Sequence, residues 1–205
     1  LPVAAEDAQG NDVLDKIIDQ DKKYISNLVP DMYQGVTKLH DLIIVFEDLS
    51  DADSLFLFLQ GWLYPTDASI NVNMSQSNIF RSIFPYLQVP DMDKNWVTVV
   101  ENMGFPKGKN KTMVIDLTDK FISDDYRLRI RTNMQIYWDH IFIASNVSEN
   151  TLRTVGLQPV AADLHYRGFS RISRRNFSSP HIPDYHFVTT GQKWRDLTGA
   201  YTRYG

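Results

Sequence analysis

The feature that most constrains this fold is a pair of uninterrupted apolar runs of strand length. Residues Leu42–Phe46 and Leu55–Leu59 contain only Leu, Ile, Val and Phe. Both runs are far shorter than the roughly 20 apolar residues that span a bilayer as a helix. A run of this length is typical of a strand that is buried on both faces or lies inside a sandwich. We therefore expect Asp41–Glu47 and Ser54–Leu63 to form central strands.

Five further segments carry strand signals. Ser69–Met74 alternates apolar and polar residues, Trp96–Val100 and Thr112–Leu117 are rich in β-branched residues, Arg127–Arg131 points three arginines outward, and Met134–Ile143 has a buried pattern. Polar turn sequences separate several of these segments, and no long helical pattern accompanies them. The sequence predicts an all-β fold, an antiparallel β-sandwich of the jelly-roll, galactose-binding-like kind.

The organisation along the chain has three parts. Residues 1–37 form a lead-in with a short helical pattern at Val13–Ile18, residues 38–148 form the sandwich, and residues 149–205 form an extended, irregular segment. The last segment contains scattered apolar anchors, and we expect it to wrap the sandwich or to reach a neighbouring module. The predicted core contains Val45, Leu57, Val72, Val114, Leu128, Ile130 and Ile136.

Composition excludes several classes of function. The 205 residues include no cysteine, so disulfides, thiolate metal sites and cysteine nucleophiles are excluded. The net charge of −4 gives no support to nucleic-acid binding, which usually needs a basic face. The charge is uneven, with 12 acidic and 4 basic residues in positions 1–60 against 3 acidic and 7 basic residues in positions 161–205. The two regions are therefore complementary, either within one fold or towards a neighbour.

The two ends of the sequence are the basis of a prediction about context. The chain begins at Leu1 without a signal peptide and stops at Gly205 without a distinct tail. We expect it to be a fragment of a longer protein. No stretch is long and apolar enough for a transmembrane helix.

Six segments of the sequence resemble those of a known family. They are Tyr33–Thr37, Gly61–Val72, Asn102–Pro106, Arg131–Asp139, Asp163–Ser170 and Trp194–Asp196. In these segments the chain is similar to the region after the propeller in large secreted bacterial proteins that combine FG-GAP repeats, an ASPIC/UnbV region and often tetratricopeptide repeats. The resemblance implies a secreted or cell-surface setting as one module among several, with no catalytic residues to carry over.

One turn imitates half of a calcium loop. Asp91, Asp93 and Asn95 alternate as the first oxygen ligands of such a loop do. However, Trp96 stands where the loop needs glycine, and Asn102 stands where it needs glutamate. A polar hairpin turn is the alternative that we favour, and we expect no cofactor, with calcium as a weak possibility.

Carboxylate–imidazole neighbours suggest a further, less favoured chemistry. Asp139 and His140 are adjacent, and adjacent strand residues point to opposite faces, so they do not form a triad pair. Asp163 and His165 can share one face, and with His181 or His186 they could bind a transition metal in a hydrolase. The alternative is a pair of structural residues joined by a hydrogen bond.

Arginines and aromatic residues gather near the C-terminus. Such a cluster suits an anionic polymer, but it suits equally a contact with the acidic N-terminal region, and we favour the intramolecular contact. The cluster consists of Tyr166, Arg167, Phe169, Arg171, Arg174 and Arg175.

Two groups pair flat aromatic rings with a carboxylate, as sugar-binding sites do. An aromatic ring stacks on the apolar face of a pyranose while the carboxylate accepts hydroxyl protons. Core packing is the alternative role for the same rings. The candidate sugar-binding residues are Trp62, Tyr64, Asp67, Tyr137, Trp138 and Asp139.

Four asparagines begin the glycosylation sequence N-x-[ST]. They are Asn73, Asn110, Asn146 and Asn176, each at an expected strand edge or loop. The motif is short and the chain is rich in asparagine, so these matches indicate surface exposure at most.

Three hypotheses follow for the function. The first is a non-catalytic scaffold or interaction module of a secreted or cell-surface multidomain protein, with a periplasmic location as a variant. Its partners would be neighbouring modules or other copies of the chain. The second is a carbohydrate-binding module, and the third is a metal-dependent hydrolase. We expect no enzymatic activity.

Overall fold

The computed structural model describes residues 1–108, 110–145, 155–163, 165–166, 168–177 and 182–191. The chain divides into two compact units, Leu1–Val147 and Ser148–Gly205. The first unit contains eight of the strands described below, one short helix and a 3-10 turn. The second contains two strands.

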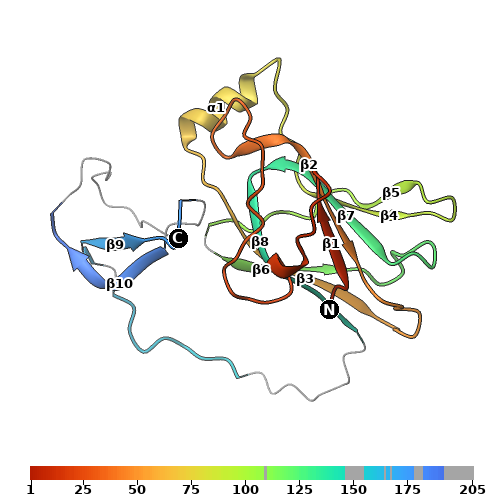
Figure 1. The fold of residues 1–205 in the computed structure, drawn as a ribbon. Coiled ribbons are helices and arrows are strands. Elements are labelled where there is room, and N and C mark those ends of the chain that lie inside the picture. The colour runs from red at the N-terminus through yellow and green to blue at the C-terminus, as the bar shows by residue number, and fades with distance from the viewer. Residues whose placement is uncertain (109, 146–154, 164, 167, 178–181, 192–205) are drawn as a thin grey trace. The chain divides into compact units, whose positions relative to one another are not determined.

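The first unit is built from two antiparallel sheets (Figure 1). The larger sheet has the order β1-β2-β7-β4-β5 and the smaller has the order β6-β3-β8. The strands of the larger sheet are β1 (Ala4–Asp7), β2 (Val36–Val45), β4 (Tyr86–Pro90), β5 (Trp96–Val100) and β7 (Arg127–Met134). Those of the smaller sheet are β3 (Leu55–Leu63), β6 (Lys111–Asp116) and β8 (Ile136–Ser145).

Apolar side chains from both sheets form one core. Leu57 of β3 and Ile141 of β8 are fully buried, and so are Ile44, Leu87 and Leu128 of the larger sheet. All five belong to one cluster of packed residues. Full burial of a side chain of this size contributes about 1.5 to 3 kcal/mol, so these contacts hold the sheets together. The predicted all-β antiparallel sandwich is confirmed.

One predicted strand is a helix. Residues Ser69–Met74 lie in α1 (Ala68–Gln76). The carboxylate of Asp67 accepts a hydrogen bond from the Ile70 backbone N–H at 2.9 Å, which caps the first turn. The apolar alternation in this segment was therefore misleading, and the N-cap residue before it was the better signal. Val72 is 52% exposed on the helix, so its predicted place in the core is wrong.

The other core predictions divide by strand face. Leu57, Leu128, Ile130 and Ile136 are all buried, as expected. Val114 is 52% exposed, because the alternation of β6 turns its neighbours toward the core instead. Val45 is only half-buried at the end of β2.

The lead-in contributes more than a helical turn. β1 pairs with β2 from Ala4↔Val45 to Asp7↔Leu42, so the larger sheet begins before residue 38. A short 3-10 helix, η1 (Leu14–Lys16), follows, and Ile17 directly after it is fully buried. The backbone N–H of Ile141 donates to the Ile17 carbonyl at 2.8 Å, which ties this segment to the edge of β8.

The second unit contains a two-stranded antiparallel sheet. β9 (Phe169–Ser173) pairs with β10 (Ile182–Thr189), with a register shift between Asp184 and Val188. The segment that the sequence predicted to be extended and irregular therefore contains one strand pairing.

Candidate interaction face

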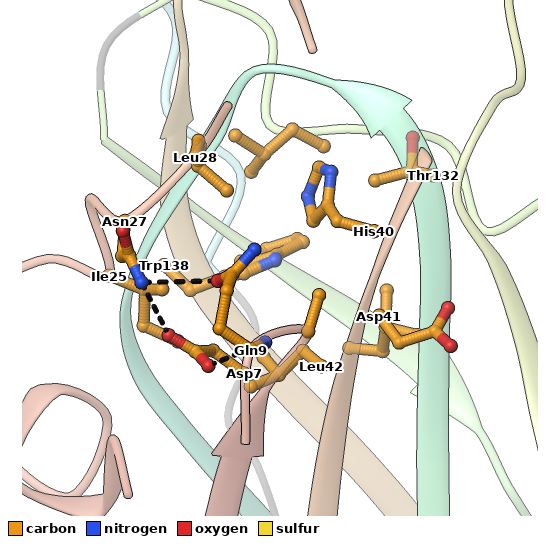
Figure 2. A pocket seen from close by; sticks show the side chains of 13 residues that line it. Asp7, Gln9, Ile25, Asn27, Leu28, His40, Asp41, Leu42, Thr132 and Trp138 are labelled. Carbon is orange, nitrogen blue, oxygen red and sulfur yellow. Dashed lines mark hydrogen bonds between the residues drawn. The ribbon is translucent and has the colours of Figure 1, made fainter. Parts of the chain in front are cut away.

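A small pocket with a mainly apolar lining lies beside the end of β1 (Figure 2). The buried Asp7 carboxylate accepts hydrogen bonds from the backbone N–H groups of Gln9 and Asn11 and from the side-chain amide of Asn27, at 2.9 to 3.1 Å. Burial works to raise the pKa of Asp7, but the hydrogen bonds from Asn11, Asn27 and Gln9 outweigh it and hold the pKa below its ordinary value. Asp7 is thus an ionised anchor for the turn after β1.

His40 lines the same pocket with an imidazole that is also engaged. Its Nδ1 lies 2.9 Å from the Thr37 hydroxyl oxygen and 3.2 Å from the Lys38 carbonyl oxygen. Burial lowers the pKa of His40, which favours the neutral ring at physiological pH. The cavity measures about 20 Å³, which is room for one or two water molecules. A substrate or a sugar ring does not fit there.

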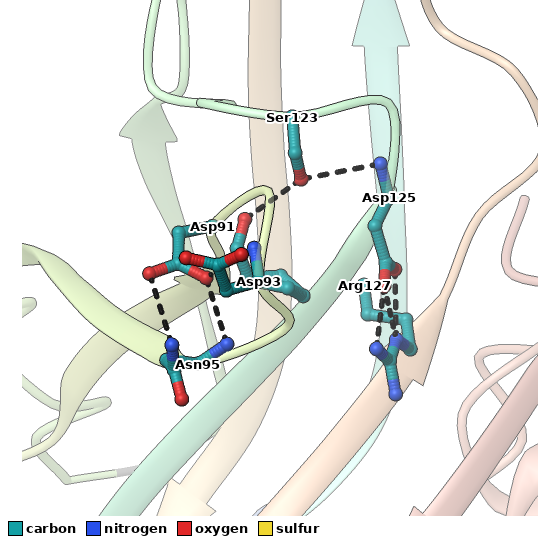
Figure 3. A network of polar contacts seen from close by, with 7 residues as sticks. Asp91, Asp93, Asn95, Ser123, Asp125 and Arg127 are labelled. Carbon is teal, nitrogen blue, oxygen red and sulfur yellow. Dashed lines mark hydrogen bonds and ion pairs between the residues drawn. The ribbon is translucent and has the colours of Figure 1, made fainter.

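The predicted half calcium loop is the turn between β4 and β5 (Figure 3). The Asp91 carboxylate accepts from the backbone N–H groups of Asp93 at 2.9 Å and Asn95 at 2.8 Å. Lys94 has a φ of 64°, which completes the tight turn. The carboxylate therefore closes the hairpin together with two backbone hydrogen bonds, from Asp91 N–H to the Asn95 carbonyl and from Lys94 N–H to the Asp91 carbonyl. Within the described part of the chain, no three His, Asp or Glu side chains are grouped to hold a metal.

The three outward arginines of β7 are each paired with a nearby side chain. Arg127 forms an ion pair with Asp125, its Nε lying 2.7 Å from Oδ1 (Figure 3). Arg129 donates to the Gln88 side-chain oxygen at 2.8 Å, and its guanidinium carbon lies 4.5 Å from the centre of the Trp96 ring. The contact with Gln88 joins the adjacent strands β7 and β4, and the contact with Trp96 reaches β5 beyond them.

The next arginine of β7 follows the same pattern. The Nε of Arg131 lies 2.8 Å from Oδ1 of Asp41 on the neighbouring strand β2. The arginines of β7 thus stabilise the sheet.

The basic–aromatic cluster lies partly in the second unit's hairpin. Arg171 forms an ion pair with Asp184 at 2.8 Å, and its guanidinium carbon lies 4.2 Å from the centre of the Phe187 ring. Tyr166 is 69% exposed. The described members of the cluster are Tyr166, Phe169, Arg171, Arg174 and Arg175, while Arg167 lies outside the described residues.

The Asp163–His165 pair makes the contact that its spacing predicted. His165 Nδ1 lies 2.8 Å from Asp163 Oδ2, and both side chains are mostly exposed. His186 donates from its backbone N–H to Asp184, and His181 lies outside the described residues. Among the described residues, the pair belongs to no group of three His, Asp or Glu side chains that could hold a metal.

The structure separates the residues of the predicted sugar site. Trp138 is 3% exposed and belongs to the main core, while Asp67 caps α1. Trp62 and Tyr137 are directly paired across β3 and β8, with ring centres 5.5 Å apart. Tyr64 packs against this pair and is half-exposed. Neither tryptophan offers a free ring face for a pyranose.

Asp139 is buried because β8 contains a bulge. Gln60 pairs with His140 and Gly61 pairs with Trp138, so Asp139 is an extra residue opposite β3. Its Oδ1 accepts from the Lys22 backbone N–H at 2.6 Å, and no partner is found for the buried Oδ2 among the described residues. Burial raises the pKa of Asp139.

The aromatic pair of Trp62 and Tyr137 is covered by the lead-in. Both lie on the outer face of the smaller sheet, the face turned away from the main core. Tyr24 packs against Tyr137 with an edge-to-face ring contact at 6.3 Å, and it is itself 6% exposed. The Asn110 amide donates to the Tyr24 hydroxyl at 2.6 Å. We call this region the covered half of the outer face.

The other half of that face is apolar, and the described residues of the first unit leave it only partly covered. Phe58 of β3 is flanked by Val114 of β6 and Phe142 of β8 in one cross-strand row. The rings of Phe58 and Phe142 stack with centres 4.8 Å apart and planes within 3°. Phe56 lies in the next row, and both phenylalanines of β3 are only half-buried, while Val114 is 52% exposed. We call these four residues the open half.

The open half was missed as a candidate site, although its signal was present. The run Leu55–Leu59 predicted burial on both faces, and Leu55, Leu57 and Leu59 are indeed at most 6% exposed. Phe56 and Phe58 alternate with them and point to the outer face. Their apolar side chains are stabilised when another segment or molecule covers them, but the sequence pattern does not identify that partner.

The sequons occupy unlike positions. The Asn73 amide donates to the Ser69 carbonyl on α1, and Asn110 is engaged with Tyr24. Asn176 is exposed, and Asn146 lies outside the described residues.

Comparison with known proteins gives no assignment. No protein-family model matches the chain, and no curated protein matches it. Among the described residues, no helix has the length and apolar character to cross a membrane.

Proposed function

We propose that this chain is a non-catalytic interaction module of a longer secreted or cell-surface protein, and that it docks through the open half. The observation that carries the proposal is the two-sided apolar character of β3. The outer face presents Phe56, Phe58, Phe142 and Val114 without a cover from the first unit. The secreted setting rests on the family resemblance of the motifs.

The physical argument starts from what a solvent-facing sheet usually looks like. Antiparallel sheets with one face in water normally place polar side chains on that face. Three phenylalanines and a valine break this pattern, and Val114 alone leaves half of its surface in water. Apolar side chains gathered on a surface mark contact sites, because burying them releases water.

The polar clusters support a non-catalytic role. The carboxylates of Asp7, Asp91 and Asp139 each accept hydrogen bonds from backbone N–H groups. Asp7 and Asp91 thereby stabilise turns, and Asp139 anchors the lead-in to β8. The pocket that Asp7 and His40 line has room for little more than a water molecule.

Carbohydrate binding is the weaker proposal. It depends on Trp62 and Trp138, and both rings are at least nine-tenths covered. A glycan array probed with the folded 205-residue chain tests it, in calcium and in EDTA. Binding that disappears in the Trp62→Ala variant would restore the sugar-binding hypothesis.

The docking face can be tested with a matched pair of variants. Val114 on β6 and Val72 on α1 are each 52% exposed. We expect Val114→Lys to reduce binding of an anilinonaphthalene dye to dilute protein, because the charge interrupts the open half. Val72→Lys should leave dye binding unchanged, and both variants should keep the melting temperature. Equal dye binding by wild type and Val114→Lys would contradict the proposal.

A further inference from the structure

The centre of the open half contains no ionisable side chain. Val114, Phe58 and Phe142 form the central row, and Phe56 and Ala144 continue it on one side. The ionisable residues stand at the edges, with Asp116 beside Phe56 and His140 beside Gln60. The His140 ring also contacts the outer flank of the central row, with its centre 4.9 Å from the centre of the Phe142 ring. An occupant must therefore be apolar at its centre and must not bring a charge onto these rings.

We propose that the occupant is a second copy of this chain, related by a two-fold axis that runs parallel to β3. This inference rests on the proposed function and names its partner. Such an axis places β6 of one copy over β8 of the other, because the two strands flank β3 on opposite sides. The small Val114 of each copy then faces the large Phe142 of the other copy. Phe58 of one copy faces Phe58 of the other.

Shape favours this axis over the alternative. An in-plane axis perpendicular to the strands would set Phe142 on Phe142 and Val114 on Val114, which crowds one contact and leaves a gap at the other. Large side chains opposite small ones interdigitate at the usual separation of about 10 Å between packed sheets. The same interface patch serves both copies, as a two-fold dimer requires.

Charge is compatible with the same arrangement. The axis places Asp116 over Ala144 of the other copy and His140 over Thr112, so no like charges are opposed. Asp116 lies on the edge strand and is exposed, and hydrogen bonds from Thr118 lower its pKa. The carboxylate stays ionised and hydrated at the rim.

The area of the open half sets the expected affinity of the dimer. Three strands about 4.8 Å apart and six residues of about 3.4 Å give a face of roughly 14 by 20 Å. This is well below the roughly 800 Å² that each partner contributes to a standard interface. We therefore expect a weak dimer, with a dissociation constant between about 1 μM and 1 mM.

Sedimentation velocity of the 205-residue chain over a range of concentrations tests the dimer. We expect the sedimentation coefficient to rise with concentration in wild type and in Val72→Lys. Val114→Lys should weaken association by at least about tenfold, because each two-fold contact would bury two ammonium groups. A chain that remains monomeric at millimolar concentration would overturn the proposal of a second copy.

Cysteine substitutions test the axis, since the chain contains no cysteine of its own. Val114→Cys and Phe142→Cys chains are mixed and treated with a short bismaleimide crosslinker. Opposed positions lie about 10 Å apart, whereas two copies of one position lie roughly 14 Å apart diagonally. Preferential joining of the two different variants supports the strand-parallel axis, and preferential joining of like variants overturns it.

The dye experiment keeps the two proposals distinguishable. A monomeric chain whose dye binding still depends on Val114 would reject the second copy while supporting a docking face for another partner. A monomeric chain without that dependence would reject both.

Discussion

The two halves of the outer face of the smaller sheet have similar residues and different surroundings. Trp62 and Tyr137 form a cross-strand aromatic pair, and so do Phe58 and Phe142. Tyr24 of the lead-in seals the first pair, whereas the first unit leaves the second pair half-exposed. The comparison teaches that an aromatic pair across two strands indicates a face that becomes buried. The position of the pair along the sheet decides whether a segment of the same unit or another partner covers it.

The largest expected effect on stability comes from removing the Tyr24 ring, which covers Trp62 and Tyr137. Tyr24→Ala deletes a ring that is 6% exposed and leaves the Asn110 amide without its acceptor. We expect a loss of about 3 to 5 kcal/mol in the free energy of unfolding, as for other buried aromatic residues. Urea unfolding measures this loss, and dye binding should rise as the covered half becomes open. A loss below about 1 kcal/mol would mean that Tyr24 is no seal.

A smaller loss in the free energy of unfolding is expected at Gly61, which lies on β3 opposite the bulge in β8. A methyl group on Gly61 would lie 2.7 Å from the Trp138 ring and 2.8 Å from the Tyr137 carbonyl oxygen. Gly61→Ala should therefore destabilise the fold by about 1 to 3 kcal/mol. Thermal unfolding checks this, with Gly104→Ala as a control at an uncrowded position whose φ of 72° alone opposes a side chain. Equal losses in the two variants would contradict the packing argument.

The pH dependence of Asp139 is expected to have a modest effect. Burial raises the pKa of this carboxyl, so the folded state holds its proton to higher pH than the unfolded state does. The wild-type chain therefore loses stability as pH rises through the raised pKa. Asp139→Asn retains an oxygen acceptor for the Lys22 backbone N–H and cannot ionise, so its stability relative to wild type should improve by about 1 kcal/mol between pH 4 and pH 7.

Urea unfolding of both proteins at the two pH values measures that difference. Asp67→Asn is the control, because hydrogen bonds lower the pKa of Asp67 and its linkage to stability therefore lies below about pH 4. The stability of Asp67→Asn relative to wild type should not improve between pH 4 and pH 7. A relative stability of Asp139→Asn that does not change with pH would show that Asp139 has the same pKa in both states.

The smallest expected effect lies in the open half. Val114→Lys should change the free energy of unfolding by no more than about 0.5 kcal/mol, because the valine contributes to no core contact across the sheets. Unfolding is measured at protein concentrations low enough to keep the chain monomeric. A loss as large as that of Tyr24→Ala would mean that the open half is part of the fold's own packing.

Local patterns predicted the central strands well. The apolar runs of β2 and β3 and the alternation of β7 each report how a side chain is placed within its own strand. The short strands β1 and β4 were missed, because their pairing depends on β2 and β7, which lie far away in the sequence. Helix α1 was mistaken for a strand because an exposed helix without a buried face leaves no helical period in its apolar residues.

The candidate sites were harder to predict. Asp91 closes a turn, as its polar hairpin alternative suggested, and this follows from local spacing. Which face of the smaller sheet Trp138 and Asp139 occupy depends on the bulge in β8. One extra residue there shifts the inward–outward alternation, and no local sequence pattern marks it. The open half depends on the absence of a covering segment from the first unit, and tertiary structure alone decides that.

Hydroxyl-radical footprinting of the dilute 205-residue chain tests the contrast between the two halves most directly. We predict oxidation at Phe58 and Phe142, and protection at Trp62 and Tyr137 despite the higher intrinsic reactivity of Trp and Tyr. Raising the protein concentration should protect Phe58 and Phe142 as well. Protection of these phenylalanines at every concentration, or strong oxidation of Trp62 and Tyr137, would contradict the account.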